Sequence, residues 1–82
     1  MSLEEVRKVK RKYSNHLMSF KNVVSVGVGR KRVNGKETNE LAIVVGVSEK
    51  LPENKLKKTD IIPKKLDGIK TDVIQVGEIT AL

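Results

Sequence analysis

The chain has 82 residues, with 17 Lys and Arg against 10 Asp and Glu, which gives it a net charge of +7. A chain of this length forms one small domain that buries only about 60% of the surface of its unfolded form. This size excludes a two-domain enzyme. The sequence contains no cysteine, which excludes disulfide frameworks, cysteine-based zinc sites, iron–sulfur clusters and thiol nucleophiles.

The chain shows no sign of a membrane span or a signal peptide. Its longest apolar run, Leu41 to Val47, has seven residues, whereas roughly 20 are needed to cross a bilayer. No apolar stretch with a cleavage site follows the basic N-terminal residues. We therefore expect a cytoplasmic protein that does not bind membranes. The apolar residues Ile79 to Leu82 raise the expectation of a domain cut from the N-terminal part of a longer protein.

The first twenty residues have the pattern of an amphipathic helix. Apolar residues recur at spacings of three and four, which predicts a helix from Leu3 to Phe20. Ser2 is placed to cap its N-terminus, and Glu5 completes a capping box. The apolar stripe consists of Leu3, Val6, Val9, Tyr13, Leu17 and Phe20.

The next segment predicts a β-hairpin. Asn34-Gly35 separates two β-rich runs, and this dipeptide favours a two-residue type I′ turn because both positions need positive φ. Pairing Val33 with Lys36 fixes the register of the two strands. The expected pairs on the bulky face are Val28 with Leu41, Val26 with Ile43, and Val24 with Val45, and we expect this face to lie under the helix.

The other face of this hairpin carries small residues. The same register places Gly27 opposite Ala42, Ser25 opposite Val44, and Val23 opposite Gly46. Small side chains permit close approach by another element or by a partner. The candidate contact face is therefore Gly27, Gly29, Ala42 and Gly46, and an exposed sheet edge that adds a partner's strand is the alternative.

The rest of the chain predicts a short helix and one more strand. Residues 51–56 form one helical turn, with Pro52 at its first position, and residues 57–65 form a polar connection. Asp67-Gly68 is a turn, and Ile69 to Val76 is a strand that Glu78 to Leu82 extend. The predicted fold class is α+β, with the N-terminal helix packed on a small, mainly antiparallel three-stranded sheet, in the order helix, β-hairpin, short helix, strand.

No motif for catalysis or cofactor binding is complete. Gly27-Val28-Gly29 lacks the third glycine of a dinucleotide fingerprint, because Arg32 stands there. His16 is the sole imidazole, and a catalytic or metal-binding histidine needs partners from other elements. No Gly-x-Ser-x-Gly elbow surrounds any serine. We therefore expect no enzyme, no catalytic or metal-binding residue, and no cofactor.

The basic residues belong to the first half of the chain. Residues 1–36 hold ten basic and two acidic residues, a balance of +8, and residues 37–82 hold seven basic and eight acidic, a balance of −1. Such a cluster predicts either a solvated face or a site for nucleic acid or another polyanion. Aromatic residues for stacking on single strands are missing from it. The candidate polyanion-binding residues are Arg7, Lys8, Lys10, Arg11, Lys12, Arg30, Lys31 and Arg32.

A series of segments resembles a known group of proteins. These segments are residues 22–29, 41–45, 49–52, 62–63 and 67–77. The series is similar to the small N-terminal region that precedes a trypsin-like serine peptidase domain in a group of bacterial proteins. The resemblance implies that the peptidase domain, with its catalytic residues, follows this segment, so no catalytic residue is carried over. It implies a leader domain that assists folding of the peptidase, masks its cleft or holds it to a partner.

Three hypotheses for function follow. The first is a non-catalytic accessory or pro-domain-like module that acts through contacts with a protein partner, which includes a downstream peptidase domain. The second is a basic module that binds nucleic acid or another polyanion. The third is a self-associating structural protein, and the oligomeric state is left open by the sequence.

Overall fold

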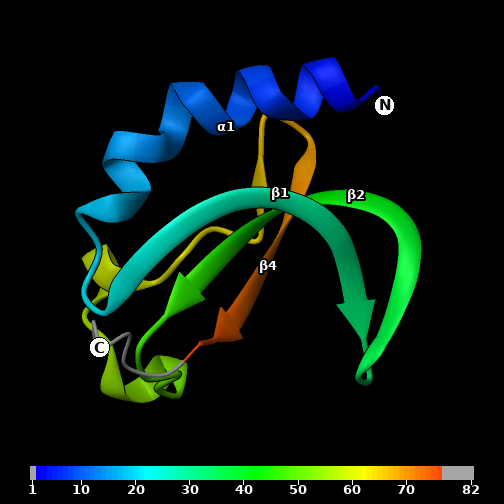
Figure 1. Ribbon diagram of the computed structural model, residues 1–82. Coiled ribbons are helices and arrows are strands. Elements are labelled where there is room, and N and C mark those ends of the chain that lie inside the picture. The colour runs from blue at the N-terminus through cyan, green and yellow to red at the C-terminus, as the bar shows by residue number, and fades with distance from the viewer. Residues whose placement is uncertain (1, 77–82) are drawn as a thin grey trace, which may run out of the picture.

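The computed structural model describes residues 2–76 and shows an α+β fold in which one helix covers one face of a mixed sheet (Figure 1). The sheet order is β1-β2-β4-β3. The elements in chain order are α1 (Leu3–Met18), β1 (Val23–Val33), β2 (Lys36–Val47), the 3-10 turns η1 (Glu53–Lys55) and η2 (Lys58–Asp60), β3 (Lys65–Leu66) and β4 (Ile69–Gln75). The predicted α+β class is confirmed.

The helix α1 has the predicted cap and apolar stripe. The Ser2 hydroxyl accepts a hydrogen bond from the Glu5 N–H at 3.2 Å, and Val6 and Leu17 are fully buried. The helix ends at Met18 rather than Phe20. The N–H groups of Ser19 and Phe20 bond the carbonyls three residues back, which tightens the last turn, and Asn22 at φ 69° turns the chain into β1.

The hairpin turn is as predicted, but the register beyond it is not. Val33 pairs with Lys36, and Arg32 pairs with Glu37. A bulge then sets Lys31 against three residues of β2, and the Thr38 hydroxyl donates to the Lys31 carbonyl at 2.7 Å. The pairs that follow are Arg30 with Leu41, Gly29 with Ala42, Val28 with Ile43, Gly27 with Val44, and Val26 with Val45.

This shift by two residues corrects the expected pairs and, from Ser25 to Arg30, keeps the expected faces. Side chains alternate with period two, so Val26 and Val28 still share a face with the buried Ile43 and Val45. A second irregularity lies between Val23 and Ser25. Val24 is the extra residue there, so it does not pair with Val45 as expected, and it is 40% exposed. Val23, expected opposite Gly46 on the small-residue face, pairs with Val47 instead and is buried in the core.

The expected three-stranded, mainly antiparallel sheet is wrong in two respects. The strand β4 pairs with β2 in parallel, so that Ile43 lies beside Thr71 and Val45 beside Val73. A fourth strand, β3, pairs with β4 across a tight turn in which Asp67 has φ 49° and Gly68 has φ 82°. The turn itself is predicted by Asp67-Gly68, whereas β3 begins at Lys65, the last residue of the expected polar connection, and ends at Leu66.

The core lies between α1 and the sheet. It contains Val6, Leu17 and Phe20 from the helical segment, with apolar residues from each strand of the described chain. The connection between β2 and β4 is tied to this layer by the buried Thr71, which donates its hydroxyl to the Pro63 carbonyl at 2.6 Å. The expected extension of the last strand by Glu78 to Leu82 lies outside the described residues.

Candidate binding surface

The helix α1 presents a row of basic side chains beside its N-terminal half. Arg7, Lys8 and Arg11 are exposed, and Lys10 is half-buried. The Arg7 guanidinium lies 3.7 Å from the Glu4 carboxylate, and both side chains are more than half exposed. An exposed pair of this kind contributes little to stability, so Arg7 can exchange Glu4 for another anion at small cost.

Lys12 has a structural contact instead. Its ammonium donates to Asp67 Oδ2 at 2.9 Å, and the Tyr13 hydroxyl donates to Asp67 Oδ1 at 2.7 Å. The hydrogen bond from Tyr13 and then that from Lys12 hold the pKa of Asp67 below its ordinary value. The same carboxylate raises the pKa of Lys12 and of Tyr13. This contact fastens the β3–β4 turn to α1, and it separates Lys12 from the basic row.

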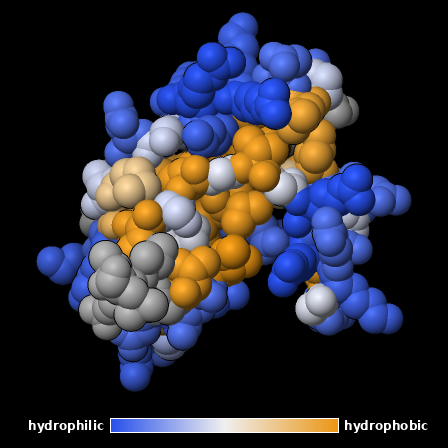
Figure 2. Space-filling model, viewed as in Figure 1, coloured by the Kyte–Doolittle hydropathy of each residue, from blue (hydrophilic) through white to orange (hydrophobic). Residues whose placement is uncertain are grey.

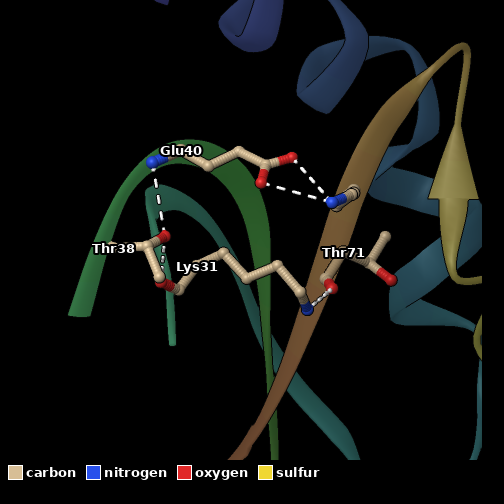
Figure 3. Close-up of polar contacts among 5 residues, drawn as sticks. Lys31, Thr38, Glu40 and Thr71 are labelled. Carbon is tan, nitrogen blue, oxygen red and sulfur yellow. Dashed lines mark hydrogen bonds and ion pairs between the residues drawn. The ribbon is translucent and has the colours of Figure 1, made fainter. Parts of the chain in front are cut away.

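The second predicted basic cluster, at the hairpin, is also partly used within the protein. The Lys31 ammonium reaches across the sheet and donates to the Thr71 carbonyl of β4 at 3.1 Å (Figure 3). The backbone N–H of Arg32 donates to Asp72 Oδ2 at 3.0 Å. Arg30 and Arg32 have exposed side chains. The bulged end of the hairpin is therefore held over β4 by two contacts.

The two basic clusters do not form one surface. In Figure 1 the hairpin turn and α1 lie at opposite ends of the molecule. Figure 2 shows hydrophilic residues over each of these ends and a hydrophobic band between them, over β1. The eight predicted polyanion-binding residues are therefore split between α1 and the hairpin.

The structure does bring part of the α1 cluster to the sheet. An open groove runs between α1 and β1, and we call it the α1–β1 groove. Its lining residues are Glu4, Arg7, Lys10, Arg11, Gly27 and Val28. The groove thus joins three predicted polyanion-binding residues with Gly27 of the predicted contact face. The sequence pattern gave these as two separate features.

The small-residue face lies on the side of the sheet away from α1, and most of its space is filled by neighbouring side chains. A Cβ added at Gly29 would lie 3.0 Å from Val44 Cγ2, and one at Gly46 would meet the Ser25 hydroxyl. Ala42 is fully buried. A Cβ added at Gly27, in contrast, would have no atom within 4 Å. Of the four predicted contact residues, Gly27 is the one with open space beside it.

His16, the sole histidine, makes an aromatic contact on α1. His16 stacks edge-on against Phe20 with ring centroids 5.0 Å apart. Within residues 2–76, no group of three His, Asp or Glu side chains is arranged to hold a metal ion. Over the same residues, no helix is long and apolar enough to cross a membrane.

Comparison with protein-family models gives no match to this chain, and comparison with curated proteins gives none either.

Proposed function

We propose that this chain is a non-catalytic accessory or pro-domain-like module that acts through protein–protein contacts in association with a trypsin-like peptidase domain. The observation that supports protein contacts is the position of β1. Within residues 2–76, this strand of eleven residues stands at the edge of the sheet, paired with β2 on one side. An edge strand presents unpaired N–H and C=O groups that an extended segment of a partner can bond.

The irregularities of β1 limit where a partner can pair. Register shifts lie between Val23 and Ser25 and between Arg30 and Arg32. Bulges bend and twist an edge and interrupt regular pairing. The regular part is therefore Ser25 to Arg30, which is long enough for a strand of five to six residues.

The association with a peptidase rests on the resemblance of residues 22–77 to the region that precedes such domains. The intact mass of the endogenous gene product, with its C-terminal peptide identified by fragmentation, tests it. We expect residues that continue past Leu82 into a peptidase domain, or a precursor that contains one. A primary product that ends at Leu82 would contradict the association and leave protein binding to be tested by itself.

A second candidate function is polyanion binding, which the basic row on α1 supports. Arg7, Lys8, Lys10 and Arg11 follow one another on the helix without an intervening acidic residue. If each contacts one phosphate of a DNA duplex, log K falls with log salt at a slope of about −3.6. Titration of a labelled duplex at several salt concentrations measures this slope, and binding that salt does not weaken would contradict the candidate.

A further inference from the structure

The α1–β1 groove combines two recognition elements that fit one kind of partner. One wall carries Arg7, Lys10 and Arg11, with Glu4 as the single acidic group among the lining residues. The other wall is the backbone of Gly27 and Val28 in the regular part of β1. Cationic side chains attract carboxylates, and an open strand edge bonds an extended backbone.

The two faces of the sheet at the β1 edge differ in charge and in the size of their side chains. On the face that α1 covers, Val26 and Val28 pack against the core, and Val28 lines the groove beside its cationic wall. On the opposite face, Ser25, Gly27 and Gly29 are small, and the space above Gly27 is open. A strand added to this edge directs alternate side chains to each face. Acidic side chains suit the first face, and apolar side chains suit the second, where they fill the space left by the glycine.

We infer that the α1–β1 groove binds an extended acidic peptide, with alternating acidic and apolar residues, that adds a strand to the β1 edge and directs its carboxylates to Arg7, Lys10 and Arg11. This inference rests on the proposed role in protein contacts and names the class of partner. The acidic residues of the peptide contact the cationic wall, and its apolar residues fill the space at Gly27. The backbone of the peptide forms hydrogen bonds with the edge of β1.

Charge argues against one other occupant, and the positions of the aromatic residues argue against another. A second copy of this chain carries the same net charge of +7, and pairing of two β1 edges would bring two cationic walls together. For nucleic acid, stacking on aromatic side chains is the usual source of single-strand binding. The two aromatic residues other than His16 are engaged in the fold, because Phe20 is buried and the Tyr13 hydroxyl bonds Asp67.

The test uses fluorescence anisotropy of labelled eight-residue peptides with the full 82-residue chain. The probe alternates Glu and Val. One control has the same composition in two blocks, four Glu followed by four Val, and another alternates Lys and Val. A third control is the probe with N-methyl groups on every second backbone amide of each parity in turn, which removes the hydrogen bonds of strand addition and keeps all charges.

Protein variants locate the site. The triple variant Arg7→Gln, Lys10→Gln and Arg11→Gln removes the cationic wall, and we expect it to raise the Kd of the alternating probe about tenfold. The matched control Lys55→Gln, Lys57→Gln and Lys58→Gln removes the same charge from exposed positions of the β2–β4 connection. We expect it to leave the Kd within about twofold, and thermal melts establish that both variants fold.

Hydrogen exchange distinguishes strand addition from binding by charge alone, because only strand addition protects the amides at the edge of β1. Every second residue of an edge strand directs its N–H away from its neighbour, so these amides of Ser25 to Arg30 exchange with solvent. We expect the alternating probe to protect them. Equal binding of the block peptide and the N-methylated peptides, with no new protection in β1, would overturn strand addition.

Three other outcomes overturn the inference. They are the absence of binding by the alternating probe, equal loss of affinity in the two triple variants, and binding of a DNA duplex with no binding of any peptide, which would favour a polyanion site. A separate experiment distinguishes failure of this inference from failure of the proposed function. A peptidase domain that binds the α1 triple variant as tightly as the natural chain would leave the accessory role standing and overturn the groove as its site.

Discussion

Asp67 is the residue that joins the turn between β3 and β4 to the helix. It adopts a left-handed conformation at φ 49°, and its carboxylate accepts hydrogen bonds from Tyr13 and Lys12 of α1. Short polar residues tolerate this backbone region better than others. One side chain thus shapes a turn and links segments more than fifty residues apart in the chain.

This contact predicts a pH dependence with two limits. The pKa of Asp67 lies below 3.8 in the folded state. Its contribution to the free energy of unfolding is therefore present above that value and is lost as the pH falls through the folded-state pKa. The pKa of Lys12 is raised above 10.5 and that of Tyr13 above 10.0, so their contributions are present below about pH 10 and are lost as the pH rises through the raised values.

We therefore expect Asp67→Asn to lower the free energy of unfolding near neutral pH, with a difference that shrinks in acid and in alkali. Urea unfolding at a series of pH values measures this difference. Glu49→Gln changes an exposed carboxyl group outside this contact and serves as the control. A constant difference between the natural chain and Asp67→Asn across the range would show that the contact does not stabilise the fold.

Thr71 makes a second contact at the residue scale. Its side chain is buried, and its hydroxyl donates to the Pro63 carbonyl at 2.6 Å. Thr71→Val keeps the shape and removes the donor, and we expect it to lower the free energy of unfolding by about 1 to 2 kcal/mol. Equilibrium urea unfolding measures the change. Unchanged stability would mean that the hydroxyl does not hold the connection to β4.

At the scale of the elements, the hairpin of β1 and β2 depends on its turn and its bulge. Asn34 and Gly35 have φ values of 52° and 79°, as a type I′ turn requires. At the bulge, Thr38 bonds the Lys31 carbonyl and Lys31 bonds β4 (Figure 3). The turn sets the local pairing, and the bulge curves the hairpin across the sheet.

We expect alanine to lower the free energy of unfolding at one glycine of this hairpin and not at another. Gly35→Ala places a Cβ at a positive φ, and we expect a loss of about 1 to 2 kcal/mol in the free energy of unfolding. Gly27→Ala places a Cβ in open space in β1, and we expect no loss, because alanine also restricts the unfolded chain. Urea unfolding of both variants gives the comparison. An equal loss at both positions would contradict this account of the hairpin.

At the scale of the whole molecule, charge opposes contact between copies. The described part of the chain measures 32 × 28 × 27 Å, and the chain carries a net charge of +7. The Debye length is about 30 Å at 0.01 M ionic strength and about 8 Å at 0.15 M. Repulsion between two copies therefore extends across a molecular diameter at low salt and is largely screened at higher salt.

We expect sedimentation equilibrium to give a monomer mass of 9.1 kDa at 0.01 M ionic strength. Any dimer is expected to increase as salt is added, since salt screens the repulsion. A dimer that is strongest at low salt and dissociates as salt is added would instead favour the self-associating protein that the sequence left as its third hypothesis.

Local patterns in the sequence predict local structure in this protein. The stripe of α1, the Ser2 cap, and the turns at Asn34-Gly35 and Asp67-Gly68 depend on interactions within a few residues, so spacing and residue type suffice. The alternation of Val26 and Val28 predicts the core face even though the register is two residues off. The bulge at Lys31 has no such signal, because it depends on a Thr38 hydroxyl and a distant β4 carbonyl.

The tertiary structure alone decided how β4 joins the sheet and where the basic side chains of α1 meet β1. The parallel pairing of β2 with β4, and with it the place of β1 at the sheet edge, arises from contacts between residues nearly thirty positions apart. The sequence determined that Arg7, Lys10 and Arg11 lie on a basic helix and that Gly27 lies in a strand. Their meeting in one groove follows from how the helix packs on the sheet, because a buried apolar stripe determines where the charged side chains beside it must lie.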